Sequence, residues 1–245
     1  QVYRLGVALG FGAESVFRGF SYGAGFVYLL LVFPLAGELA ATDASRRLLS
    51  LALVTAGYIQ IFCGYIETYP LLFTGILGYV LLGVRALKRG NGPGVAALYL
   101  AVLTTYHYIA FMLSPSLLVL VWSARARTVN AVSWVRIAGS LAVAAAAALA
   151  VLYALGVNLF AYTGELRTSH FLPLYGSLDY TQAYLLFSWQ HALDLFNEYM
   201  LVVPIVALVL LGCRISWRGD AAQIFLVLSA LGPLCFVCCA NPEIG

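Results

Sequence analysis

Glu67 is the carboxylate whose surroundings most favour chemistry. It lies in the segment Gly64-Tyr65-Ile66-Glu67-Thr68-Tyr69-Pro70, between two long apolar runs. An ionised carboxylate at the edge of hydrocarbon costs roughly a few kcal/mol unless it is hydrated or paired, so this position favours a general base or a substrate clamp. The alternative is a solvated loop glutamate, with Tyr65 and Tyr69 in the aromatic belt of a membrane interface.

Three polar side chains recur on one face of a later segment. His191, Asp194 and Glu198 are spaced i, i+3 and i+7, which places them within an arc of about 60° on a helix. Such a face can build a metal site or an acid-base pair. Carboxylates in the first turns of a helix also complement its positive dipole end, and that alternative stays open.

Imidazole and guanidinium groups are the candidate partners of an anionic ligand. His107 lies between two tyrosines, where it would either bind a backbone carbonyl or contact an anionic head group. Arg167 and His170 lie in a long polar connection, and a phosphate-bearing ligand would need them. Ion pairs with Glu165 and Asp179 explain these two residues equally well.

The composition indicates a membrane protein. Of 245 residues, 63% are apolar and 9% are charged, whereas a soluble domain carries roughly 25% charged residues. Lipid must therefore solvate much of the exterior. The net charge of +3 is small and scattered, which argues against a nucleic-acid partner. The five cysteines lie in or beside apolar runs and lack the ligand spacing of a zinc site, so we expect small apolar side chains.

Long apolar runs predict an all-α fold, a polytopic bundle of about seven to eight transmembrane helices. Six runs are long enough to span: 21–40, 48–66, 70–87, 132–156, 192–213 and 223–240. The stretch 95–123 contains Ser114-Pro115, so we expect a short broken hairpin with its break near Ser114.

The predicted organisation has two parts. Residues 1–20 form an interfacial helix or the tail of a missing helix, and 21–245 form the transmembrane domain. The chain begins with Gln1, so we expect a fragment of a longer protein.

Charge placement predicts which end of each helix faces the cytoplasm. Lys and Arg mark cytoplasmic ends. All four basic clusters lie on the cytoplasmic side of the membrane if 95–123 is a hairpin. They are Arg46-Arg47, Arg85 with Lys88-Arg89, Arg125 with Arg127 and Arg136, and Arg214 with Arg218. Most acidic residues, including Glu67, and the connection 158–190 then face the extracytoplasmic side, where they would line a water-filled mouth.

Two segments carry a resemblance to a known family. The segment from Gly64 to Leu72, with the following span that ends at Arg85 to Arg89, resembles the middle of GT-C type membrane glycosyltransferases. The short helices around His107 and Ser114-Pro115, and the terminal Asn241-Pro242-Glu243-Ile244-Gly245, resemble related bacterial membrane proteins. The resemblance covers roughly residues 20 to 245.

The resemblance implies transfer of a sugar from a polyprenyl-phosphate carrier to an acceptor, at the extracytoplasmic face of a bacterial plasma membrane. We predict Glu67 as the catalytic carboxylate. The predicted substrate-binding residues are Tyr65, Tyr69, His107, Arg167, His170, His191, Asp194 and Glu198. We predict no cofactor, and a divalent metal stays open.

One departure from the family pattern leaves other functions in consideration. These transferases usually carry an acidic motif in the loop after their first helix, and no Asp-Asp or Asp-Glu pair occurs here. Either that loop precedes Gln1 or this protein differs from the family. The alternatives are a transporter or flippase, whose gate would be the broken hairpin, and a non-catalytic membrane assembly protein.

Overall fold

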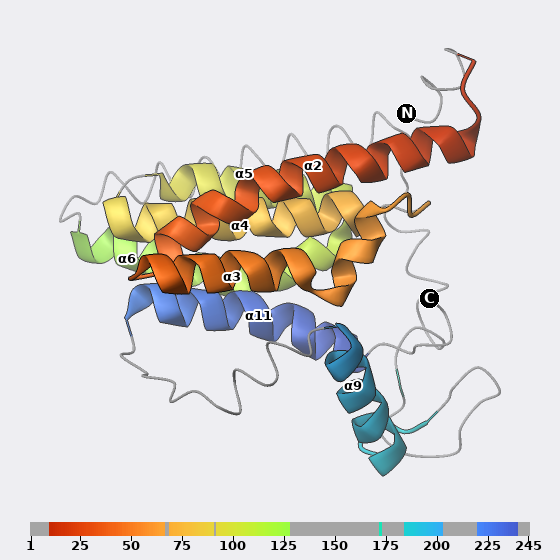
Figure 1. The fold of residues 1–245 in the computed structure, drawn as a ribbon. Coiled ribbons are helices and arrows are strands. Elements are labelled where there is room, and N and C mark those ends of the chain that lie inside the picture. The colour runs from red at the N-terminus through yellow and green to blue at the C-terminus, as the bar shows by residue number, and fades with distance from the viewer. Residues whose placement is uncertain are drawn as a thin grey trace.

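The computed structural model describes residues 10–66, 69–90, 92–127, 172, 184–202 and 220–239. Within these ranges every regular element is a helix. The elements are α2 (Ala13–Leu39), α3 (Asp43–Thr55), the 3-10 helix η1 (Gly57–Phe62), α4 (Tyr69–Arg89), α5 (Pro93–Tyr106), the 3-10 helix η2 (Tyr108–Leu113), α6 (Ser114–Arg127), α9 (Trp189–Val202) and α11 (Ala221–Cys239). Figure 1 shows α2 to α6 and α11 running along one common direction, with α9 turned away at one end.

Helices α2 and α4 pack against each other and are the two longest helices of the described part of the chain. They are the two helices, among the described residues, that are long and apolar enough to cross a membrane. Their 27 and 21 residues correspond to about 40 Å and 31 Å at 1.5 Å per residue. Helix α4 is mostly buried, whereas α2 exposes a ridge of Tyr22, Phe26, Leu30 and Phe33, each more than half exposed. Such an apolar ridge favours lipid as its solvent.

The first two helices differ from the prediction. Residues 13–20 are the first turns of α2, which continues to Leu39, and residues 1–9 of the predicted first segment lie outside the described residues. The prediction of one continuous span over 48–66 is wrong, because α3 ends at Thr55 and η1 follows.

The later predicted spans are described only in part. The run 70–87 corresponds to α4, and the run 223–240 corresponds to α11. The run 192–213 is described only up to Val202, within α9. The run 132–156 lies outside the described residues.

Side chains of α2 explain how the chain can leave the α-helix after Thr55. Carbonyls at the end of a helix have no intrahelical partner and need another donor. The hydroxyl oxygens of Tyr28 and Tyr58 each lie 3.2 Å from the Leu53 carbonyl oxygen and 2.5 Å from each other, so one hydroxyl donates to the carbonyl and the other donates to its partner hydroxyl. Ser21 donates to the Ile61 carbonyl at 2.7 Å. In a membrane such partners are required wherever the backbone is not helical.

The broken hairpin is present, and its break is longer than predicted. Helix α5 ends at Tyr106, His107 is extended, and η2 leads into α6 at Ser114. Pro115 lies in the first turn of α6, where its missing N–H breaks no intrahelical bond. The second limb has 14 residues, or about 21 Å.

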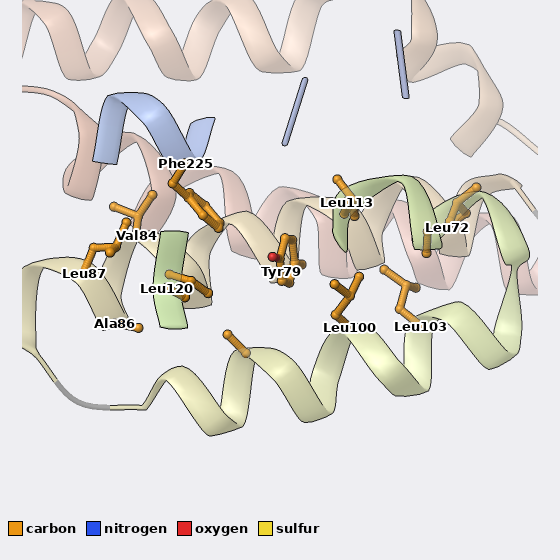
Figure 2. Close-up of a cluster of buried hydrophobic side chains, with 12 residues drawn as sticks. Leu72, Tyr79, Val84, Ala86, Leu87, Leu100, Leu103, Leu113, Leu120 and Phe225 are labelled. Atoms are coloured by element: carbon orange, nitrogen blue, oxygen red, sulfur yellow. The ribbon is translucent and has the colours of Figure 1, made fainter. Parts of the chain in front are cut away.

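The core lies where α4, α5, α6, η2 and α11 meet (Figure 2). Phe225 of α11 and Tyr79 of α4 are fully buried, with ring centres 5.7 Å apart. The Tyr79 hydroxyl lies 2.8 Å from the hydroxyl of Ser116, which itself donates to the Leu113 carbonyl at 2.7 Å. Backbones also approach closely, since a Cβ on Gly232 would lie 1.8 Å from the Met112 carbonyl oxygen. Small residues allow such contacts between helices in lipid.

The bundle has two chemically different ends. At one end, Glu38 near the close of α2 receives Arg85 Nε at 3.0 Å and Arg89 Nη2 at 2.8 Å on the same carboxylate oxygen. We name this the Glu38 end. The other end holds the start of α4 and the junction of α5 with η2, and we name it the Tyr69 end.

Candidate functional site

The side chains of Arg18 and Tyr22 lie beside the turn that precedes α4. Gly64 adopts φ +93°, a left-handed conformation that favours glycine, and its N–H donates to Ser21 Oγ at 3.2 Å. A Cβ at this position would lie 3.0 Å from the Tyr22 hydroxyl oxygen and 3.7 Å from Arg18 Cγ. Arg18 also forms an ion pair with Glu14 one helical turn away. A cation therefore stands beside the segment that leads to position 67.

Tyr69 and His107 meet at the same end of the bundle. Their ring centres lie 5.5 Å apart, and the His107 ring stacks on Tyr108 at 5.3 Å. Tyr65 in the preceding turn is 44% exposed. The contact brings together two of the segments that the sequence analysis singled out, which are 38 residues apart (107 − 69).

His107 stands in the connection between α5 and η2, outside both helices. Burial lowers the pKa of its imidazole below the ordinary value of 6.5. Its Nδ1 accepts a weak hydrogen bond from the Ile109 N–H at 3.4 Å. The group is therefore neutral at neutral pH and offers a hydrogen bond rather than a positive charge to a ligand.

A second cluster forms where the start of α9 meets the end of α11. Ser188 precedes α9, and its Oγ accepts from the His191 N–H at 3.2 Å, as an N-cap residue does. The His191 side chain is buried and donates its Nε2–H to the Cys238 carbonyl at 2.7 Å. Its buried Nδ1 has no hydrogen-bond partner among the described residues. The sequence predicts a hydrogen bond to a backbone carbonyl as one possibility for His107. In the structure, His191 makes such a bond.

Asp194 and His191 both contact Tyr184, whereas Glu198 lies apart from this cluster. Tyr184 donates its hydroxyl to Asp194 Oδ2 at 2.5 Å, and its ring centre lies 4.9 Å from that of His191. Glu198 is exposed and makes no ion pair with another described residue. Over the described ranges no three metal-binding side chains gather at one point.

An apolar groove of about 740 Å³ lies between α9 and α11 and includes His191 in its wall. Phe187, Trp189 and Leu234 border it, and each is more than half exposed. The volume is typical of small-molecule sites, which measure roughly 300–1,000 Å³. An apolar chain would bury these side chains.

Three predicted site residues, Glu67, Arg167 and His170, lie outside the described residues. Two further residues, Tyr184 and Arg18, contact these sites but are not among the site residues predicted from the sequence. Tyr184 pairs with Asp194 from outside the helix, and no spacing rule indicates that contact. Arg18 had a usable signal, since it lies i+4 from Glu14 at the predicted extracytoplasmic end.

Comparisons with protein-family models, with curated proteins and with solved structures gave no match.

Proposed function

We propose that this chain belongs to an integral membrane transferase that moves a sugar from a polyprenyl-phosphate donor to an acceptor at the Tyr69 end. The observation that carries the proposal is the contact between Tyr69 and His107. It joins the start of α4, two residues after Glu67, to the broken hairpin, at the end away from the basic cluster around Glu38. An extracytoplasmic site needs this separation.

The donor offers a long isoprenoid chain, a phosphate and a sugar, and the Tyr69 end has a counterpart for each. The apolar groove between α9 and α11 fits the isoprenoid chain. Arg18, whose side chain lies beside Gly64, would bind the phosphate in exchange for its ion pair with Glu14. Tyr65, Tyr69 and His107 would contact the sugar as aromatic surfaces and hydrogen-bond groups.

Glu67 is the proposed general base. The acceptor hydroxyl oxygen attacks the anomeric carbon of the sugar, and the bond from that carbon to the phosphate oxygen breaks. The polyprenyl phosphate leaves with the bonding electron pair, and Glu67 takes the proton of the hydroxyl. His107 is neutral, so it would hydrogen-bond to the sugar and would not neutralise the phosphate.

Transport and membrane assembly rest on weaker support. A transporter site near the membrane midplane generally contains ionisable side chains. In the part of the chain that the structure describes, the buried polar side chains of the main core are hydroxyl groups, as in the pair Tyr79 and Ser116. No specific contact among these residues favours either alternative.

The test is sugar transfer by the full-length protein in liposomes that contain a labelled polyprenyl-phosphate sugar. Glu67→Gln keeps the shape and removes the base, so we expect turnover to fall about 10²- to 10⁴-fold. Asp43→Asn removes an exposed carboxylate at the Glu38 end and is the matched control. Unchanged turnover in Glu67→Gln removes Glu67 from the mechanism. No transfer by the wild-type protein with any lipid-linked sugar would reject the proposed function.

A further inference from the structure

A crevice between α2 and α3, at the Glu38 end, combines apolar walls with a basic rim. It has a volume of about 780 Å³, and Phe33 and Pro34 of α2 face Leu51 and Val54 of α3 across it. Its rim carries Arg46 and Arg47. Helix α3 buries none of its side chains fully, so the crevice is open along this helix.

The rim has an excess of positive charge. Arg46 forms an exposed ion pair with Asp43 at 3.0 Å, and Arg47 makes no ion pair with another described residue. The neighbouring cations Arg85, Lys88 and Arg89 all lie within 4.0 Å of the single carboxylate of Glu38. An anion at the rim would therefore meet unneutralised guanidinium charge.

Helix α3 has a basic start and an exposed apolar face. Its first turns carry Asp43, Arg46 and Arg47, while Leu48 and Leu51 are 53% and 57% exposed. Because α3 runs alongside α2 and α4, the helices long enough to cross a membrane (Figure 1), its basic first turns lie at the depth of the head groups and its exposed leucines lie further along the acyl chains. The crevice then opens at the depth of the lipid head groups, with its apolar walls directed along the acyl chains.

We propose that this crevice is a binding site for an anionic phospholipid. Its phosphate binds Arg46 and Arg47, and one acyl chain lies between Phe33, Leu51 and Val54. A soluble phosphate would use only the rim and leave these walls uncovered. The site lies at the end opposite the proposed transfer site, so it does not depend on that function.

The test measures phosphatidylglycerol and phosphatidylcholine bound to the full-length protein in neutral detergent, by native mass spectrometry, with thermal unfolding in parallel. We expect preferential binding of phosphatidylglycerol. Arg46→Gln and Arg47→Gln should each weaken that binding about fivefold, since one basic side chain near an anionic surface contributes about that factor. Lys88→Gln removes one positive charge at the same end, from the cluster around Glu38 and outside the crevice, and should leave the preference unchanged.

A second variant separates a lipid from a soluble anion. Ser50 lines the crevice, so Ser50→Trp fills it and keeps both arginines. Loss of phosphatidylglycerol binding in this variant supports the lipid site. Equal binding of the two lipids by the wild-type protein overturns the proposal. The proposal is also overturned if glycerol phosphate raises the thermal unfolding midpoint as much as phosphatidylglycerol does and this effect survives in Ser50→Trp.

Discussion

The ring of Tyr69 lies 5.5 Å from the imidazole of His107, measured between ring centres. Helices α4 and α5 are joined at the Glu38 end by the short connection around Gly90 and Gly92. The contact between Tyr69 and His107 therefore closes the opposite, open end of this helical pair. It is also the point at which a neutral imidazole and two tyrosine rings stand together.

The lowered pKa of His107 predicts a stability that depends on pH. The folded protein binds the proton of this group less readily than the unfolded chain, whose histidine titrates near 6.5. The stabilisation is therefore complete above about pH 6.5 and is lost as the pH falls through the folded pKa. We expect thermal unfolding midpoints of the wild type to fall more steeply below pH 6.5 than those of His107→Gln. Parallel curves from pH 8 to pH 5 would contradict this prediction.

Neutralising the carboxylate of Glu38 should lower the free energy of unfolding of the protein. Its side chain is only 16% exposed and faces three cations, of which Arg85 and Arg89 donate to one oxygen. The cations are 37% to 60% exposed, so solvent screens part of the attraction. We expect Glu38→Gln to cost about 1–3 kcal/mol, measured by unfolding in detergent.

Asp43→Asn is the control for Glu38→Gln, because it removes a carboxylate from an exposed pair at the same end. The Asp43 side chain is 76% exposed, and we expect a change below about 1 kcal/mol. Higher ionic strength should reduce the effect of the Glu38 change. Equal effects of the two substitutions would show that the arrangement around Glu38 adds nothing beyond a surface pair.

The close contact of α11 with η2 at Gly232 leaves no room for a side chain at this position. Alanine there would place its Cβ 1.8 Å from the Met112 carbonyl oxygen, a backbone atom that cannot rotate away. We expect Gly232→Ala to lower stability by about 1–3 kcal/mol, as overpacking does. Gly19→Ala in α2 meets no heavy atom within 4 Å and should be neutral or slightly stabilising. Unfolding midpoints that coincide for the two variants would reject the close approach.

The elements that the sequence predicts well are those decided by local features. The apolar run 70–87 matches α4, and Ser114-Pro115 marks the start of α6. The break after Thr55 has no such local signal, because residues 48–66 are almost uniformly apolar. Ser21 and Tyr28, which lie far away in the sequence, supply its hydrogen bonds.

The candidate site, too, could be predicted only in part from the sequence. Sidedness from charge placed the segment around Glu67 and His107 at one end, and the contact of Tyr69 with His107 agrees with this placement. The environment of His191 was not predictable. It depends on how α9 packs against the last turns of α11, and the Cys238 carbonyl that it binds carries no side-chain signal.

The proposed function requires the two ends of the bundle to face opposite sides of the membrane, and labelling can test this. In a background without the five native cysteines, Tyr65→Cys probes the turn before α4, and Ala44→Cys probes the exposed start of α3 at the Glu38 end. Helix α4 separates these ends by about 31 Å. A membrane-impermeant maleimide should label Tyr65→Cys in intact cells and Ala44→Cys only after permeabilisation, since basic loops stay in the cytoplasm. Labelling of both positions from one side would place the aromatic cluster and the arginine-rich end in one compartment, where an extracytoplasmic donor could not reach its proposed base.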